Sequence, residues 1–406
     1  MGLVVMKFGG SSVANAEKIK NVARRVIQTR DKGNRVVVVV SAPGDTTDDL
    51  ITMAEGITPE PDPREMDMLL ATGEQISIAL LGMAIKDKGC KAISLTGAQV
   101  GILTDNTHSN AKVKHIPTDK IRKELKRGNI VIVAGFQGVT ENEDITTLGR
   151  GGSDLTAVAL ASVLKADVCE IFTDVMGVYT TDPRVVPEAR KLDTISYDEM
   201  LEMAGLGAQV MQARSIEVAK KFNIDIHVRS TFSEAEGTFI TREVQKMEDV
   251  VVRGIASDKN QAKISIIDLP DKPGEAARMF KDLADKHINV DMIIQSSASD
   301  GRNDISFTVG HKDLSKTLEV MERIRRELGA KDVIHDSNVA KVSIVGVGMR
   351  SHVGVAAKMF SALAREGINI EMISTSEIKI SCVIKNTQVD KAVKAIHRVF
   401  NLDKKK

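Results

Sequence analysis

A lysine and two glycines stand together near the start of the chain. The run Lys7-Phe8-Gly9-Gly10-Ser11-Ser12 directly follows an apolar segment. Glycines let backbone N–H groups approach an anion, a following helix contributes its positive end, and Lys7 adds a mobile charge. The pattern favours a phosphate-binding turn, although an ordinary strand-to-helix turn could also require glycine. It is neither the Walker pattern nor the dinucleotide fingerprint.

A second glycine-rich turn carries an arginine. Gly149-Arg150-Gly151-Gly152-Ser153-Asp154 precedes a helix-forming run that begins at Leu155. We expect Ser153 or Asp154 to cap that helix. Capping does not explain the arginine, whose planar guanidinium can bind a carboxylate through two hydrogen bonds. The turn therefore predicts a carboxylate-binding site.

Three further polar segments could complete such a site. Ligands of open α/β sheets bind at the carboxyl ends of the strands, which is where two of these segments are expected. The first contains Thr173, Asp174, Tyr179, Asp182 and Arg184, and Asp182-Pro183 could also be a simple turn. The second runs from Ser41 to Thr47. The third is Glu74, at the margin of an apolar helical stripe formed by Leu69, Ile76, Leu80 and Met83, where a solvated glutamate is the usual interpretation.

The elements that must position these residues alternate between strand and helix over the first 230 residues. This alternation predicts an α/β domain with a mainly parallel sheet. We expect strands at 3–8, 35–41, 91–95, 129–134, 168–173 and 224–229. Helices are expected near 15–32, 65–88, 118–127, 154–165, 196–204 and 210–222.

The C-terminal part of the chain contains an internal repeat. After a linker expected between 230 and 250, residues 274–293 match residues 354–373 at 11 of 20 positions. Each copy reads as a strand, a glycine turn, an amphipathic helix and a strand, which predicts paired ferredoxin-like units. Their ligand-facing loops differ, with Asp271-Lys272-Pro273 in one copy and Arg350-Ser351-His352-Val353 in the other.

Composition excludes several classes of protein. The 56 basic and 55 acidic residues leave a net charge of +1, and two Tyr with no Trp offer few stacking platforms for nucleic acid. Three separated cysteines and scattered histidines predict neither a disulfide framework nor a transition-metal site. With no leader-like segment and no uninterrupted apolar run of about 18 residues, we expect a cytoplasmic protein.

Taken in order, these motifs resemble the amino acid kinase family, and within it the aspartate kinases. The resemblance rests on the Lys7 turn, Gly73-Glu74, the Gly149–Asp154 turn and the segment from Thr173 to Arg184, and the repeated part is similar to paired ACT domains. It implies a carbamate kinase-like α/β domain at 1–245 followed by two βαββαβ ACT domains. The first ACT domain would be 263–337, and the second would combine 250–262 with 338–403.

The resemblance also implies roles for individual residues. ATP would be held by Lys7, Phe8, Gly9, Gly10, Thr173, Asp174, Tyr179, Asp182, Arg184 and Gln209. Many members carry lysine where Gln209 stands, so this chain lacks that charge. Aspartate would be bound by Ser41, Thr47, Glu74, Arg150, Gly151, Gly152 and Ser153, with Lys7, Arg150 and Asp154 as the catalytic group.

The expected reaction moves the γ-phosphoryl group of ATP, with Mg²⁺, to the side-chain carboxylate of aspartate. That carboxylate is already ionised at neutral pH, so Asp154 is expected to organise the site and not to accept a proton. Glu74 suits the substrate ammonium and Arg150 its α-carboxylate. A nucleotide-monophosphate kinase and a catalytically silent amino-acid sensor remain alternatives.

The ACT resemblance implies feedback control by lysine, threonine or both. The effector contacts would be Asp271, Gly274, Glu275, Ala276, Asn289, Val290, Asp291, Gln295, Asn369, Ile370, Ser376 and Glu377. Asn289 and Asn369 could instead simply terminate turns. The segment 250–256 is expected to be a strand of the second ACT unit. The resemblance further implies a homo-oligomer formed through the ACT domains, and Met247 could start an internally translated short chain.

Overall fold

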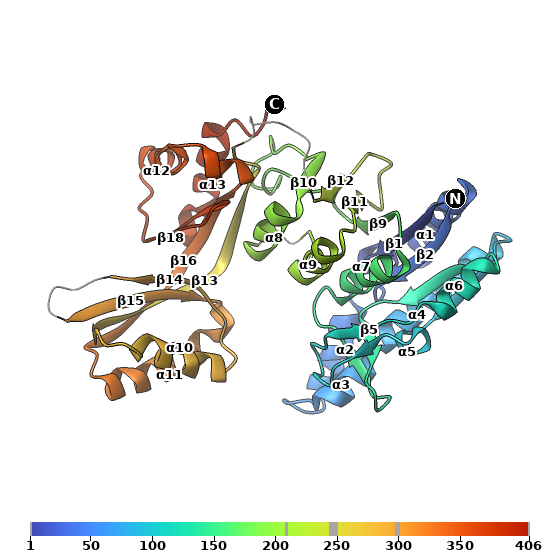
Figure 1. Ribbon diagram of the computed structural model, residues 1–406, viewed down its shortest axis with the longest axis horizontal. Helices are drawn as coiled ribbons and strands as arrows, with labels where there is room; N and C mark the ends of the chain where they lie inside the picture. Colours follow the sequence, from blue (N-terminus) through green and yellow to red (C-terminus); the bar gives the residue numbers. More distant parts are fainter. Residues whose placement is uncertain (1, 208–209, 243–250, 297–300, 405–406) are drawn as a thin grey trace. The chain divides into compact units, whose positions relative to one another are not determined.

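The computed structural model describes residues 2–207, 210–242, 251–296 and 301–404 (Figure 1). The predictions made for Gln209 and Met247 therefore fall outside the described residues. The chain forms two compact units. The first comprises Met1–Val178, Lys191–Ala204 and Gln209–Gln245, and the second comprises Tyr179–Arg190, Gly205–Ala208 and Lys246–Lys406.

The first unit is built on a mainly parallel sheet of eight strands. The strand order is β10-β12-β11-β9-β1-β2-β6-β3, and only the β11–β12 pair is antiparallel. The six predicted strands are present. The bounds are β1 (Leu3–Phe8), β2 (Arg35–Val40), β3 (Ala92–Leu95), β6 (Ile130–Ala134), β9 (Val168–Thr173), β10 (Thr194–Ser196), β11 (Ile226–Ser230) and β12 (Thr238–Thr241).

Helices cover the sheet because its central strands are apolar on both faces. In β2, the five valines from Val36 to Val40 are all buried. α1 (Ala16–Asp31) and α4 (Thr72–Asp87) contact each other and bury their apolar sides on alternate residues of β1 and β2. α7 (Gly152–Leu164) also packs on β1 and β2, and it contacts α9 (Ala213–Phe222). The other helices of this unit are α2 (Thr46–Glu55), α3 (Pro63–Leu70), α5 (Gly97–Val100), α6 (Asp119–Lys126) and most of α8 (Tyr197–Gly205).

The predicted helix 65–88 is formed by α3 and α4, but its buried face was assigned wrongly. Ile76, Leu80 and Met83 are exposed, with Met83 at 65 %, whereas Glu74 is 3 % exposed. The buried face combines small residues with large apolar ones, and apart from Glu74 it consists of Gly73, Ser77, Ile78, Leu81, Gly82 and Ile85. Pro63–Asp87 is long and apolar enough to cross a membrane by length and composition, but half of its apolar window is buried, as in a core helix.

A small second sheet in the first unit was not predicted. It has the order β5-β4-β7-β8 and consists of β4 (Leu103–Thr104), β5 (Val113–His115), β7 (Gln137–Val139) and β8 (Ile145–Thr147). Strands of two or three residues are too short to show an alternating pattern. The loop between β4 and β5 becomes important at the site below.

The second unit is built on one antiparallel sheet that serves both sequence repeats. Its order is β14-β15-β13-β16-β18-β17. β13 (Gly254–Pro270) and β16 (Asp332–Val345) pair along most of their length and pass from one repeat into the other. The strand expected at 250–256 begins at Gly254. The remaining strands are β14 (Val290–Gln295), β15 (Arg302–Val309), β17 (Met372–Thr375) and β18 (Lys379–Lys385).

Each repeat contributes two helices and a core of its own. α10 (Glu275–Asp285) and α11 (Leu314–Leu328) close one core, and α12 (Val355–Arg365) and α13 (Val389–Val399) close the other. Gly274 and Gly354 occupy the same left-handed position before α10 and α12, at φ 100° and 86°. The order β13-α10-β14-β15-α11-β16 confirms a ferredoxin-like βαββαβ unit, and the second copy, β16-α12-β17-β18-α13, takes its remaining strand from the N-terminal part of β13.

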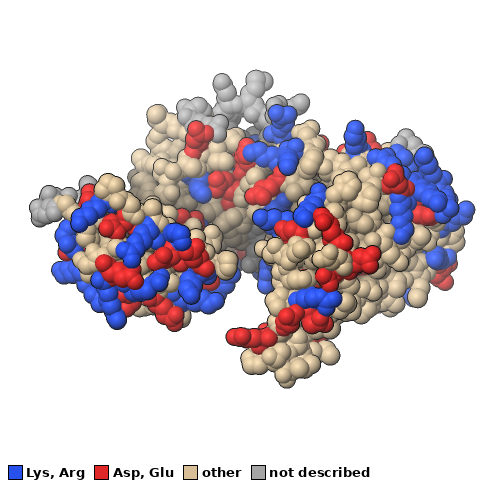
Figure 2. All heavy atoms as spheres, turned by 60° about the horizontal axis from the view of Figure 1, so that its bottom comes forward, with Lys and Arg blue, Asp and Glu red and all other residues tan. Residues whose placement is uncertain are grey.

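The segment Tyr179–Arg190 belongs to the second unit. Val186 and Ala189 lie in the core closed by α12 and α13, and the Thr180 hydroxyl is 3.1 Å from Nε2 of His397. A stretch expected to bind nucleotide is thus packed onto the second repeat. Figure 2 shows basic and acidic side chains interspersed over the first C-terminal repeat, at the left of the view, in keeping with the balanced charge of the chain.

Candidate functional site

An open pocket of about 380 Å³ lies in the first unit. It brings together residues from four of the predicted motifs: Lys7, Ser41, Thr47, Glu74, Arg150, Gly151, Gly152, Ser153 and Asp154. Gly149 of the predicted arginine-bearing turn also lines it, and the lining residues that were not predicted are Asp48, Ile51, Leu70, Ser109, Phe136 and Thr147. The structure therefore gathers the proposed substrate residues around one cavity.

Lys7 and Asp154 form an ion pair at the pocket wall. Lys7 Nζ lies 2.6 Å from Asp154 Oδ1, and both side chains are about nine-tenths buried. Lys7 is in β1 and Asp154 is in the first turn of α7, which packs on β1. The pair places a positive charge beside a carboxylate at the wall of the cavity.

The turn after β1 is held close to the turn after β2. A methyl group at Gly10 would lie 2.7 Å from the carbonyl oxygen of Ala42, so glycine is required for this approach. The Gly9 N–H donates to the Phe172 carbonyl at 3.3 Å and is already used. The Phe8 ring is fully buried and stacks on Phe172 at 4.6 Å, so only the backbone of Phe8 could reach a ligand.

Glu74 is a buried carboxylate that faces the pocket. Its Oε1 accepts the Ala42 N–H at 2.9 Å, while Oε2 has no hydrogen-bond partner in the described structure. Burial raises the pKa of Glu74 to about 7, and the Ala42 hydrogen bond offsets only part of that rise. A buried acceptor without a partner is costly, so the pocket is suited to a ligand that donates to Oε2.

The arginine-bearing turn depends on its glycines. Gly149 and Gly151 have φ of 77° and 72°, in the left-handed region that glycine tolerates. A methyl group at Gly151 would lie 2.1 Å from the Gln212 side chain. α7 begins at Gly152, with Gly151 at the N-cap and no side-chain cap, so the capping role predicted for Ser153 or Asp154 is wrong. Both residues lie in the first turn of α7 instead.

The residues predicted to hold the nucleotide divide between the two units. Thr173 donates to Asp174 at 3.0 Å at the end of β9, in the first unit. Tyr179, Asp182 and Arg184 belong to the second unit. There Arg184 donates to both carboxylate oxygens of Asp182, which lowers the pKa of Asp182. Tyr179 packs on the core closed by α12 and α13.

Several predicted effector residues lie near β14 and β17, the two edge strands of the sheet in the second unit. Met292 of β14 and Met372 of β17 share one apolar cluster, which brings these strands together. Asp291 pairs with Lys341, a buried lysine that is 2 % exposed and was not predicted. Asp271 accepts from Asn303 at 3.0 Å. Gly274 is the N-cap of α10 and Glu275 is its first residue, Gln295 ends β14, and Ser376 and Glu377 follow β17. Ala276 and Val290 pack against the core of the first repeat, and Ile370 packs against that of the second. Asn289 and Asn369 directly precede Val290 and Ile370 in the sequence.

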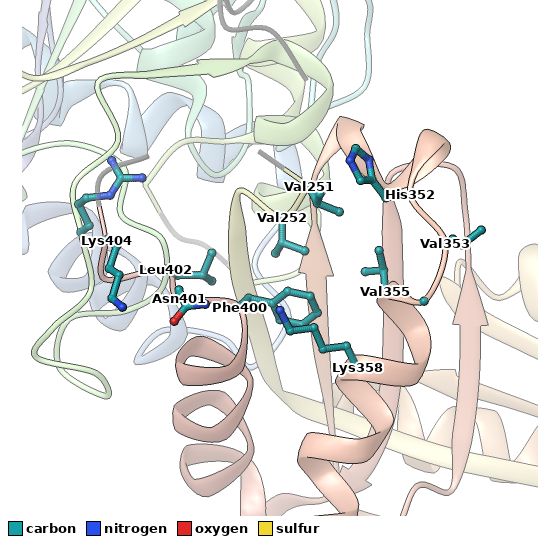
Figure 3. Close-up of a pocket in the computed structure, with 12 residues that line it drawn as sticks. Val251, Val252, His352, Val353, Val355, Lys358, Phe400, Asn401, Leu402 and Lys404 are labelled. Atoms are coloured by element: carbon teal, nitrogen blue, oxygen red, sulfur yellow. The ribbon is translucent and has the colours of Figure 1, made fainter. Parts of the chain in front are cut away.

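A second cavity, of about 210 Å³, lies elsewhere in the second unit (Figure 3). Its lining includes Arg190, His352, Lys358 and Lys404, with Lys358 Nζ 4.9 Å from the centre of the Phe400 ring. None of the predicted effector residues lines it. The cavity is lined instead by His352 and Val353, from the loop of the second repeat that was predicted to face a ligand.

The pocket of the first unit has the chemistry to hold a small zwitterion beside a polyanion. Glu74 offers an acceptor for an ammonium group, Arg150 offers donors for a carboxylate, and Lys7 supplies positive charge. No group of three or more potential metal ligands occurs among the described residues.

Comparisons with known proteins agree with this geometry. The amino acid kinase family profile matches residues 2–230, and an ACT domain profile matches residues 264–323 and 342–400. An aspartokinase of Mycolicibacterium smegmatis is 51 % identical over 407 residues, covering 99 % of this chain and 97 % of that protein.

Solved structures of Escherichia coli aspartokinase III also match. They are 26 % identical to this chain and cover 98 % of it and 99 % of that protein. The TM-score is 0.83 for its R-state complex with aspartate and ADP. It is 0.77 for its T-state complex with lysine and aspartate.

Proposed function

The chain belongs to the aspartokinases of the amino acid kinase family, and we propose that it converts L-aspartate and ATP to 4-phospho-L-aspartate and ADP. The observation that carries the proposal is the pocket that joins Lys7, Glu74, Arg150 and Asp154. The relative solved with aspartate and ADP supports the choice of both substrates.

Glu74 and Arg150 are proposed to select the amino acid. The Glu74 carboxylate accepts the substrate ammonium, which supplies Oε2 with the partner it lacks in the described structure. Arg150 donates to the α-carboxylate through its guanidinium fork. Ser41, Thr47 and Ser153 add hydroxyl groups, and the backbone of Gly151 and Gly152 completes this wall.

The task of the site is then to bring two anions together. The aspartate side chain is ionised at neutral pH and needs no general base, so the barrier is mainly charge repulsion. Lys7 is proposed to neutralise charge on the transferred phosphoryl group. Asp154 holds Lys7 in place at 2.6 Å and acts as an organiser.

The carboxylates near the pocket are the kind of ligand that Mg²⁺ takes when it binds together with a nucleotide. The described residues offer no cluster of three ligands, but one or two carboxylates with phosphate oxygens are a common magnesium environment. Asp154 lines the pocket, and Asp174 follows β9. When bound, Mg²⁺ would offset phosphate charge. Thr173, Asp174, Tyr179, Asp182, Arg184 and Gln209, with the Lys7–Gly10 turn, remain the proposed ATP residues.

A coupled ADP-release assay tests the activity. The purified chain should release ADP with aspartate, and should release at least tenfold less with glutamate or UMP. ADP release only with UMP would support a nucleotide-monophosphate kinase. No release with any acceptor would support a silent sensor.

Feedback control at the repeats is the regulatory part of the proposal. Lysine or threonine would bind the effector residues named above, because the carboxylate of Glu275 suits an ammonium group, and Asp271 and Asp291 could offer further oxygens beside their contacts with Asn303 and Lys341. The T-state relative solved with lysine supports lysine as one candidate. Titration calorimetry with each amino acid, alone and together, tests this, and the absence of heat from both would contradict it.

The cellular setting follows from the proposed reaction. 4-Phospho-L-aspartate would open lysine, threonine and methionine synthesis in the cytoplasm. We propose a kinase domain at 1–245 and ACT domains at 263–337 and at 250–262 with 338–403. A homo-oligomer formed through the ACT domains, with or without a short chain started at Met247, completes the proposal.

A further inference from the structure

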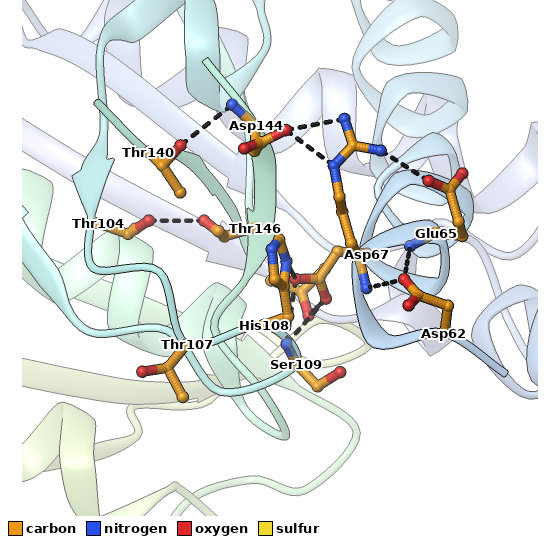
Figure 4. A network of polar contacts seen from close by, with 12 residues as sticks. Asp62, Glu65, Asp67, Thr104, Thr107, His108, Ser109, Thr140, Asp144 and Thr146 are labelled. Carbon is orange, nitrogen blue, oxygen red and sulfur yellow. Dashed lines mark hydrogen bonds and ion pairs between the residues drawn. The ribbon is translucent and has the colours of Figure 1, made fainter. Parts of the chain in front are cut away.

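The buried carboxylate of Asp67 does not line the pocket, but it accepts hydrogen bonds from two residues that do, Ser109 and Thr147. Asp67, on α3, is 0 % exposed. The Ser109 N–H lies 3.0 Å from each of its oxygens, and the Thr147 hydroxyl donates to Oδ1 at 2.5 Å. His108 Nδ1 lies 2.8 Å from Oδ2 (Figure 4). Ser109 and Thr147 line the pocket, whereas Asp67 does not.

The position of Asp67 is not explained by the needs of its own helix. α3 is already capped by Asp62, which accepts the N–H groups of Arg64 at 2.9 Å and Glu65 at 3.2 Å. A buried charge is costly unless hydrogen bonds compensate it. Asp67 obtains those hydrogen bonds from the β4–β5 loop and from β8, so its contacts serve the pocket wall.

Ser109 adopts a backbone conformation that serine seldom takes. Its φ is 65°, in the left-handed region, which costs a non-glycine residue about 1 kcal/mol or more. The hydrogen bonds from its N–H to Asp67 hold it there. Without them, we expect the loop to relax toward ordinary dihedral angles and to move Ser109 away from the cavity.

The loop held by Asp67 packs directly on the arginine-bearing turn. A methyl group at Gly149 would lie 3.1 Å from the Ser109 carbonyl and 2.9 Å from Asn110 Oδ1. From α9, Arg214 donates to Asn110 Oδ1 and the Leu148 carbonyl at 2.8 Å, and to the Ala111 carbonyl at 2.9 Å. The two loops are thus fixed as one wall, and a shift of Ser109 reaches Arg150 through Gly149.

We propose that Ser109 is a further contact for the amino-acid substrate and that Asp67 is the positioning residue that sets its place. This inference rests on the proposed function. Asp67 acts through Ser109, Thr147 and the turn that carries Arg150. Its loss should weaken binding of the amino acid while ATP binding and the chemical step remain.

The test is Asp67→Asn in the full chain, measured by steady-state kinetics and aspartate calorimetry. Asparagine keeps the shape but cannot accept hydrogen bonds on both branches. We expect at least a tenfold rise in KM and Kd for aspartate, with kcat within threefold and KM for ATP within twofold. Asp62→Asn is the matched control, since it makes the same chemical change at the start of the same helix without touching either loop, and it should leave KM for aspartate unchanged.

A double variant separates positioning from general loss of structure. Ser109→Ala alone should raise KM for aspartate about threefold to tenfold, and adding it to Asp67→Asn should cause little further loss, because both changes act through the Ser109 side chain. Should Asp67→Asn not fold, Thr147→Val removes one of these hydrogen bonds alone and should still raise KM for aspartate severalfold.

Three results would overturn the inference. One is a folded Asp67→Asn variant that binds aspartate as the wild type does. Another is an equal loss of affinity for aspartate and ATP, which would indicate general damage. The third is a double variant, Asp67→Asn with Ser109→Ala, whose loss of affinity equals the product of the two single losses, because the two residues would then act independently. If the wild type itself neither binds nor phosphorylates aspartate, the proposed function fails first, and this inference fails with it.

Discussion

The ammonium nitrogen of Lys7 lies 2.6 Å from a carboxylate oxygen of Asp154, and both side chains are about nine-tenths buried at the pocket wall. The pair joins β1 to the first turn of α7, so its geometry is set by the packing of that helix on the sheet. A lysine held in this way loses little freedom when phosphate arrives, which suits it to stabilise charge during phosphoryl transfer.

Replacing Lys7 by alanine should therefore affect turnover more than substrate binding. We expect kcat to fall by about 10²- to 10³-fold, because a preorganised charge is lost, while KM for aspartate changes less than threefold. Steady-state kinetics measure both values, and Lys20→Ala, at an exposed position on α1, is the control. A large loss of aspartate affinity with unchanged kcat would refute the role of Lys7.

The affinity for aspartate should depend on the ionisation of Glu74. The pKa of Glu74 is raised to about 7, so its carboxyl is mostly protonated at pH 6 and mostly ionised at pH 8. Only the ionised form attracts an ammonium group, so kcat/KM for aspartate should rise about tenfold between these pH values and then level off. The pH profile of kcat/KM measures this, and Glu74→Gln should abolish the step.

Glu74 should also lower the stability of the protein above neutral pH. The folded state keeps the proton up to about pH 7, whereas the unfolded chain releases it near 4.5, so the free energy of unfolding falls as pH rises through this range. The raised pKa corresponds to a loss of about 3 kcal/mol in the free energy of unfolding once the group is ionised. Glu74→Gln avoids this loss, but its unpaired amide would itself cost about 1 kcal/mol.

Urea unfolding measures this effect. Glu74→Gln should be more stable than the wild type by about 2 kcal/mol at pH 8, and the difference should vanish at about pH 5 and reverse below it. Equal stability of the two proteins at pH 8 would show that Glu74 is not destabilised by burial. A gain in stability with a loss of aspartate affinity is the expected trade-off at a binding site.

Gly73 should tolerate no larger residue. A methyl group there would lie 2.6 Å from the Ala42 methyl, next to the hydrogen bond between Ala42 and Glu74. Gly73→Ala should destabilise the fold by about 1–3 kcal/mol and raise KM for aspartate, because Ser41 and Ala42 must move. Thermal unfolding and kinetics measure both effects.

Another helical glycine provides the control for this variant. Gly205, in α8, has open space around its α-carbon, so Gly205→Ala should be neutral or slightly stabilising. Equal effects of the two substitutions would contradict the steric explanation for Gly73.

The sequence allowed the main sheet and most of the pocket to be predicted, because these depend on local patterns. A run of valines, glycine turns and an arginine between glycines are visible without knowledge of distant contacts. Glu74 illustrates the limit. Its helix has apolar residues on both sides, so hydrophobicity alone does not predict which side is buried. The buried side is the one where Gly73 and Gly82 allow close contact with Ala42 and Ser94.

Ser109 shows a second kind of limit. It lies in a loop between two very short strands, and its role arises from Asp67, 42 positions earlier in the chain. An aspartate within a helix normally suggests a solvated residue, so neither member of the pair carries a local signal. The link between Asp291 and Lys341 was missed for the same reason.

The boundary between the two repeats of the C-terminal unit falls inside β13 and β16, because each of these strands belongs to both copies. Neither copy can be lifted out as an independent module, because its removal would cut two hydrogen-bonded strands in mid-length. The register of β13 against β16 shifts between Asp258 and Lys263, where the strands pass from one copy to the other. The duplicated half is therefore one folding unit with two cores, and it cannot be divided into two independent domains.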